Sequence, residues 1–188
     1  MTIEEVGTVG VVGAGLMGSG IALNFALAGY ETIICDLEED VLVGAREKID
    51  AALAMFVEEG LANSAQADSA ISCIEVTTDL GDLAQRSDFI TEAIVERLED
   101  KQRLFRHLDE TCPPHTVIVS NTSSLKLSDI GNGVARQERL GLTHYFVPPH
   151  IVPGVEIAKG PGTSDETFQL LYDLMKAIRK VPIRVLKE

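Results

Sequence analysis

The sequence has few cysteines and few basic residues, and both shortages narrow the classes of protein it can belong to. Its 188 residues include three cysteines, which are widely spaced and form no CxxC pair. Neither a zinc site nor a disulfide framework is therefore expected, and a reducing, cytoplasmic location fits best. Lys and Arg number 16 against 29 Asp and Glu, with no dense basic cluster. This argues against nucleic-acid and anionic-membrane partners, because both need concentrated positive charge.

Charge is also absent from residues 6–30, a run long enough to span a bilayer. The run contains seven glycines, and two glutamates rather than a basic segment precede it. These features do not suit a membrane span or a secretory signal peptide. A buried strand followed by a buried helix explains the same apolarity, so no membrane partner is expected.

Apolar, β-branched segments alternate with helical patterns along the chain. Strands are expected at residues 8–12, 31–35, 87–94, 116–120, 139–146, 155–158 and 181–186. Helices are expected at residues 16–28, 38–59 and 98–109, and a last helix is expected after a capping-box pattern from Thr163 to Glu166. Near-continuous apolar strands alternating with helices predict an α/β fold, with a doubly wound, mostly parallel sheet covered on both faces. Residues 1–188 are read as one domain with a helical extension at about 41–75.

The first motif that carries chemistry is GAGLMG, which lies between the first strand and the first helix. Gly13 permits a tight turn, Gly15 lets a pyrophosphate approach the backbone, and Gly18 lets the helix pack closely on the strand. Leu16 and Met17 begin the helix, whose free N–H groups favour bound phosphates. The context predicts a Rossmann-type dinucleotide site.

Asp36 supplies the second half of this fingerprint, because it ends the second strand at the expected distance. Its carboxylate can accept hydrogen bonds from both ribose hydroxyls and would repel a 2′-phosphate. The next residues are Leu37, Glu38 and Glu39, which offer no arginine for that phosphate. NAD is therefore favoured over NADP. The alternative is that Asp36 only caps the following helix.

His144 and Glu156, on two neighbouring expected strands, are candidates for a catalytic base and its partner. A dehydrogenase needs a base for the hydroxyl proton, and histidine titrates near neutrality. His144 lies at the end of a strand, where open α/β sheets bind ligands. Glu156 lies on the next strand and can orient the imidazole. His144 could instead be a core histidine, while His150 is expected to be an exposed loop residue, and His107 and His115 surface residues.

Taken together, the segments GAGLMGSGIA, EAIVERLEDK, SNTSSL, the His144-to-Glu156 spacing and TSDETF resemble the NAD-binding domain of the 3-hydroxyacyl-CoA dehydrogenase family. The resemblance runs essentially end to end. It implies that His144 is the catalytic base and Glu156 its partner, and that Ser123 binds the reacting oxygen. It further implies that Glu96 and Lys101 lie near the cofactor and that Asn121 lies beside the active site. Without it, Ser123 could be a turn residue, and Glu96 and Lys101 a solvated helix start.

Two departures from the family pattern affect what the resemblance implies. Val147 stands where the family commonly has Asn, so a polar group near the substrate is missing. The family also continues into a helical C-terminal domain that closes over the substrate and forms a homodimer, and this chain ends before it. Three functions remain open: a 3-hydroxyacyl-CoA dehydrogenase, a dehydrogenase of free 3-hydroxy acids such as sugar acids, or hydroxylated amines, and a catalytically weak NAD-binding module.

Overall fold

One eight-stranded sheet organises the computed structural model, which describes residues 1–187. In chain order its strands are β1 (Thr8–Val12), β2 (Glu31–Cys35), β3 (Ile74–Thr77), β4 (Phe89–Glu92), β5 (Val117–Ser120), β6 (Leu140–Tyr145), β7 (Gly154–Ala158) and β8 (Val181–Val185). Their order across the sheet is β3-β2-β1-β4-β5-β6-β7-β8. Strands β1 to β6 are parallel, and β7 and β8 run the opposite way. The predicted doubly wound, mostly parallel sheet is confirmed.

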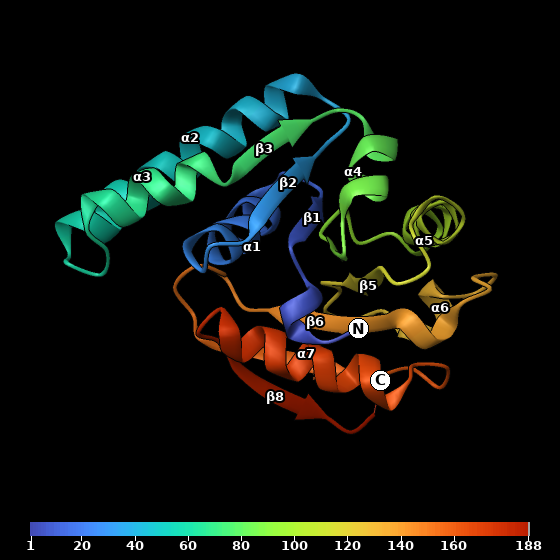
Figure 1. The fold of residues 1–188 in the computed structure, drawn as a ribbon. Coiled ribbons are helices and arrows are strands. Elements are labelled where there is room, and N and C mark those ends of the chain that lie inside the picture. The colour runs from blue at the N-terminus through green and yellow to red at the C-terminus, as the bar shows by residue number, and fades with distance from the viewer. Residues whose placement is uncertain (188) are drawn as a thin grey trace.

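Helices cover both faces of this sheet (Figure 1). They are α1 (Leu16–Leu27), α2 (Glu39–Glu58), α3 (Ser64–Ser72), α4 (Leu80–Arg86), α5 (Leu98–Thr111), α6 (Leu127–Ile130) and α7 (Asp165–Ala177). Helices α1, α2, α3 and α7 share one buried core, and α4, α5 and α6 share the other. Adjacent residues of a strand serve opposite cores, as Val11 and Val12 of β1 do. The apolar strands are therefore buried on both sides.

The direction in which successive strands are added to the sheet reverses beside β1. The chain leaves β1 toward β2 on one side, whereas β4 lies on the other side of β1. At such a switch point the loops that follow the two strands diverge, so a ligand can enter between them. Figure 1 shows α2 and α3 side by side near β3, and α7 with β8 at the far edge. No helix within residues 1–187 combines the length and apolarity needed to cross a bilayer.

Strand β3 and helix α4 were not expected from the sequence. Strand β3 is a half-buried edge strand that carries Glu75, so its pattern is not that of a buried strand. Helix α4 has only seven residues, too few for a helical period to be visible. Its start is marked by Asp79, whose side chain accepts a hydrogen bond from the backbone N–H of Asp82. The expected helical extension contains α2 and α3, and whether the chain is one domain stays a prediction.

The capping box expected from Thr163 to Glu166 is wrong by one residue. The N-cap of α7 is Ser164, whose Oγ accepts from the backbone N–H of Thr167 at 3.0 Å. The Thr163 hydroxyl instead donates to the carbonyl of Leu140 at 2.7 Å and ties the helix entry to β6. A threonine followed by a serine offers two hydroxyls for one cap, and the buried partner on β6 decides between them.

Candidate active site

The glycine-rich turn between β1 and α1 has the shape that the motif predicts. Gly13 has a positive φ of +101°, and an added Cβ would lie 2.6 Å from the carbonyl oxygen of Ala93. At Gly18 an added Cβ would lie 1.7 Å from the Gly13 carbonyl oxygen, so helix and turn are in direct contact. An added Cβ at Gly15 would meet no atom within 4 Å. The backbone is therefore open to a ligand at Gly15, beside the unpaired N–H groups of the first helical turn.

Asp36 lies immediately after β2 and braces this turn. Its Oδ2 accepts from the backbone N–H of Ala14 at 2.7 Å, and its Oδ1 accepts from that of Leu37 at 2.8 Å. The N-cap of α2 is Glu38, so Asp36 is not the cap of that helix. The carboxylate borders the open backbone at Gly15 from the neighbouring strand, which is where a ribose would have to lie if the phosphates bind at the turn.

A buried ionic network, which the sequence did not reveal, joins the ends of β4 and β5. The Glu92 carboxylate is completely buried and lies 2.5 Å from the Lys101 Nζ. It also accepts from the Ser120 hydroxyl at 2.5 Å and from the backbone N–H of Ile94 at 2.7 Å. The only sequence signal was a glutamate that closes an apolar strand. The network fixes where β4 and β5 end, at the edge of the sheet formed by the carboxyl ends of the parallel strands.

Glu96 extends the network to the loop after β5. Its carboxylate accepts from the hydroxyl of Thr122, from that of Ser124 at 3.1 Å and from the backbone N–H of Ser123 at 3.2 Å. It also lies 3.2 Å from the Lys101 Nζ. Desolvation opposes its ionisation, but the Thr122 hydrogen bond and the Lys101 charge outweigh it, so the pKa of Glu96 is lowered. Lys101 is only 1% exposed, which rules out the solvated helix start for that residue.

Asn121 connects this loop to β6. Its Oδ1 accepts from the backbone N–H of Tyr145 at 2.9 Å, and its own backbone N–H donates to the Glu92 carbonyl. The side chain thus replaces the strand pairing that would continue past β5. It fixes the position of His144, the residue before Tyr145, relative to the Ser123 loop.

His144 and Glu156 contact each other across the β6–β7 hairpin. The two residues are direct partners in the antiparallel register. Directly opposed side chains in such a pair project from the same face. The His144 Nδ1 lies 2.9 Å from the Glu156 Oε2, and the Phe146 ring lies 5.1 Å from the imidazole. The pairing of the two strands therefore holds the imidazole in one orientation.

A hollow of about 250 Å³ brings these residues together with the loop after β5. His144, Glu156, Ser123 and Lys126 all line it. The side chain of His144 is about a quarter exposed, so its ring is partly shielded but still reachable. The hollow joins an imidazole paired with a carboxylate, a serine hydroxyl and a lysine. This set can take up the proton of a hydroxyl group and bind the oxygen that remains.

The other three histidines lie outside this hollow. His107 and His115 are exposed as expected, and His115 lies 3.0 Å from Asp88. His150 is not the exposed loop residue that the sequence suggested. Its ring packs against Phe56 at a centroid distance of 5.9 Å, and burial lowers its pKa. Within residues 1–187 no group of His, Cys, Asp and Glu is arranged to hold a metal ion.

The chain is similar in sequence to known dehydrogenases. Residues 8–188 match the family described as "3-hydroxyacyl-CoA dehydrogenase, NAD binding domain". The mitochondrial hydroxyacyl-coenzyme A dehydrogenase of Homo sapiens is 37% identical over 180 residues, which are 93% of this chain and 57% of that protein. The chain therefore spans little more than half the length of that relative.

Solved structures show the same fold. The (S)-3-hydroxybutyryl-CoA dehydrogenase of Ralstonia eutropha superposes with a TM-score of 0.94 at 29% identity, covering 98% of this chain and 65% of that one. A diketoreductase that acts on dicarbonyl compounds superposes with a TM-score of 0.92 at 27% identity, covering 97% of this chain and 65% of that one. By sequence and by fold, the chain belongs to the NAD-binding domain family of the 3-hydroxyacyl-CoA dehydrogenases.

Proposed function

We propose that this chain is the cofactor-binding part of an NAD-dependent 3-hydroxyacyl-CoA dehydrogenase in which His144 is the catalytic base. The observation that carries the proposal is the 2.9 Å contact between the His144 Nδ1 and the Glu156 Oε2, in a hollow that Ser123 also lines. The reaction is oxidation of a 3-hydroxyacyl thioester to the 3-oxo compound, or its reverse.

The contact with Glu156 determines which nitrogen of His144 can act as a base. A carboxylate accepts hydrogen bonds, so Nδ1 carries a proton that it donates to Glu156. The lone pair then lies on Nε2, which takes the hydroxyl proton. Glu156 stabilises the imidazolium that forms, and Ser123 donates its hydroxyl hydrogen to the substrate oxygen. This division of roles is that of a base with an orienting partner.

The glycine turn and Asp36 would hold the cofactor. The open backbone at Gly15 accommodates the pyrophosphate, while Leu16, Met17 and Gly18 begin the helix whose N–H groups face it. NAD held there would supply the acceptor for the hydride of the substrate carbon. Glu96, Lys101 and Asn121 act as positioning residues, because they hold the Ser123 loop and β6 together.

Cofactor selectivity provides the first prediction. NADH should bind at least tenfold more tightly than NADPH, because Asp36 accepts from the ribose hydroxyls and repels a 2′-phosphate. Asp36→Ala should reduce this ratio by weakening NADH more than NADPH. Titrating the fluorescence of each nucleotide with the protein measures both affinities.

Asp36→Asn is the matched control, since its amide oxygen can still accept from the Ala14 N–H, while the charge and the acceptor for the Leu37 N–H are lost. NADPH affinity should rise in this variant while the glycine turn stays in place. Equal affinities for the two nucleotides in the unchanged protein would contradict the assignment of Asp36.

The surface charge bears on whether the substrate is a CoA thioester or a free 3-hydroxy acid. Residues 49–85 contain no Lys or Arg and seven acidic residues, so this part of the surface is unfavourable for the phosphates of coenzyme A. Because the diketoreductase of the same fold acts on dicarbonyl compounds, a dehydrogenase of free 3-hydroxy acids is the second candidate. A catalytically weak NAD-binding module is the third, and Val147 is the residue that favours it.

Salt dependence can separate the first two candidates. A thioester bound through scattered cations should bind weakly, and its KM should rise steeply between low and physiological salt. Acetoacetyl-CoA and a panel of free 3-hydroxy acids should be assayed with NADH or NAD across that range. A low-micromolar KM for the thioester that does not change with salt would show that the acidic surface does not matter.

Partners and location stay predictions. A homodimer is expected only together with a C-terminal domain of the kind that the family has, and no nucleic acid or membrane partner is expected. The cytoplasm is predicted from the cysteine content, whereas the names of relatives point to mitochondria and peroxisomes.

A further inference from the structure

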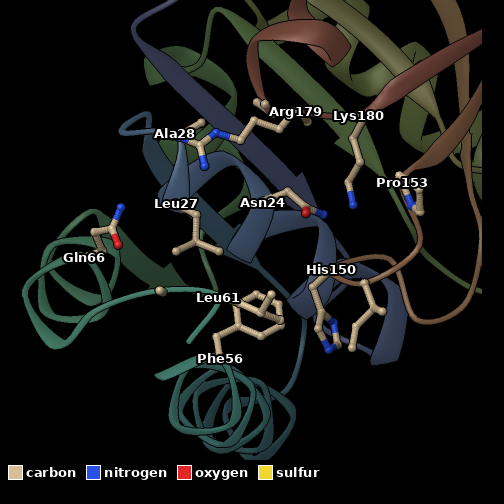
Figure 2. A pocket seen from close by; sticks show the side chains of 13 residues that line it. Asn24, Leu27, Ala28, Phe56, Leu61, Gln66, His150, Pro153, Arg179 and Lys180 are labelled. Atoms are coloured by element: carbon tan, nitrogen blue, oxygen red, sulfur yellow. The ribbon is translucent and has the colours of Figure 1, made fainter. Parts of the chain in front are cut away.

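A second hollow of about 250 Å³ lies on the opposite face of the sheet from His144. Leu142, two residues before His144, faces the core of α4, α5 and α6. The second hollow is built instead from α1, the end of α2, the loop that follows it, the loop between β6 and β7, and the end of α7 (Figure 2). The proposed reaction uses none of its side chains.

The hollow is cationic, although the chain carries a net charge of −13. Lys180 and Arg179 line it, and no aspartate or glutamate does. Lys180 is 7% exposed, and its Nζ donates to the carbonyls of Pro149 at 2.6 Å and Val152 at 3.0 Å. Within residues 1–187 this ammonium has no carboxylate partner, and desolvation lowers its pKa to about 8. A buried cation that has only neutral acceptors is stabilised by an added counter-charge.

Arg179 stands at the mouth of the hollow with its guanidinium unengaged. It is exposed, and within the described residues it forms no ion pair or side-chain hydrogen bond. Its backbone has a positive φ of 62°, which is the left-handed position after the last turn of α7. This backbone directs the side chain of Arg179 toward α1, near Ala28 and Leu27 (Figure 2).

The opposite wall of the hollow is apolar. Phe56 and Leu61 line it from the end of α2 and the following loop, and Ile151 lines it from the β6–β7 loop. Leu61 is 69% exposed and Ile151 is 50% exposed, so two large aliphatic side chains at the rim are open to water. Figure 2 shows Lys180 and Arg179 on one side of the hollow and Phe56 and Leu61 on the other. Cations facing an apolar wall suit a ligand with a charged head and an apolar tail.

We infer that this hollow binds a small monocarboxylate with an aliphatic tail, its head between Lys180 and Arg179 and its tail against Phe56 and Leu61. Lys180 has three donors and uses two of them on carbonyls, so one remains. Figure 2 shows the Lys180 ammonium near Pro153 and the Arg179 side chain near Ala28, so the two cations border the head from different sides and each offers N–H donors to a carboxylate. The C-terminal ends of α1 and α7 also border the hollow, and their dipoles oppose any anion, a phosphate dianion more than a carboxylate. The charges of Lys180 and Arg179 must outweigh them. The inference does not depend on the proposed function.

Octanoate, octanol and octylamine titrated into the 188-residue protein provide the test. Calorimetry should show saturable binding of octanoate and at least tenfold weaker binding of the other two. Arg179→Gly should weaken octanoate at least tenfold, and glycine suits the positive φ at this position, so the fold is retained. Leu61→Ser, at an exposed position, should also weaken it. Arg46→Ala changes the net charge equally, lies on the exposed side of α2, and should leave binding unchanged.

Several results would overturn the inference. Octylamine binding as tightly as octanoate would mean that only apolar contact matters, and an equal loss in Arg46→Ala would mean diffuse charge attraction. Displacement of octanoate by free coenzyme A at comparable concentration would assign the hollow to the nucleotide instead. NADH titration of the same samples tests the cofactor site separately, so a failure of the proposed function is distinguishable.

Discussion

Turnover of a 3-hydroxyacyl substrate is expected to fall about 10²–10⁴-fold when His144 is replaced by alanine, while the affinity for NADH stays nearly unchanged. The imidazole lies on β6, and the glycine turn that would hold the cofactor follows β1 on the other side of β4 and β5. Removing the ring would therefore remove the proposed proton acceptor without touching the proposed nucleotide site. Steady-state rates in the enzyme that contains this domain, together with NADH titration, measure the two effects separately.

Glu156→Gln tests the partner of the base. Glutamine keeps a hydrogen-bond acceptor for the Nδ1 proton but loses the charge that stabilises the imidazolium. Turnover should fall, and the acid limb of its pH dependence should move to lower pH, because protonating His144 becomes less favourable. A purely structural contact between the two residues would leave the pH dependence unchanged.

His150→Ala is the matched control, since His150 lies in the loop that follows β6 but packs against Phe56 on the other face of the sheet. It should have little effect on turnover. The assignment of the base is wrong if His144→Ala keeps most of the activity, or if His150→Ala proves to be the inactivating change.

The sequence predicted the geometry of those parts of the candidate site that depend on local structure, while the roles of their residues stay predictions. Gly13, Gly15 and Asp36 could be identified because a tight turn between a strand and a helix restricts which residues can occupy and flank it. His144 and Glu156 were identifiable because each lies on an apolar strand whose partner strand follows directly.

Contacts between distant segments could not be predicted in this way. The network of Glu92, Ser120 and Lys101 depends on the pairing of β4 with β5, which only the fold reveals. The packing of His150 against Phe56 likewise joins residues that are 94 positions apart in the chain. In both cases a polar residue without a recognisable motif is covered by a residue that is distant in the sequence.

The buried pair of Glu92 and Lys101 should be the most sensitive point of the fold. Lys101→Met is expected to lower the free energy of unfolding by about 3–5 kcal/mol, because it leaves the Glu92 carboxylate buried without a counter-charge. Urea unfolding followed by circular dichroism measures the loss as a lower midpoint with an unchanged slope. Lys126→Met, at an exposed position, is the control and should change stability by less than about 0.5 kcal/mol.

The double variant Glu92→Gln with Lys101→Met separates the unpaired charge from lost packing. Glutamine is neutral and can still accept from the Ser120 hydroxyl and the Ile94 N–H, so the double variant should regain much of the stability that Lys101→Met loses. If the double variant is no more stable than Lys101→Met, the loss comes from packing around the lysine stem. A loss as small as that of Lys126→Met would mean that water or another cation reaches Glu92, and that the network does not hold the ends of β4 and β5.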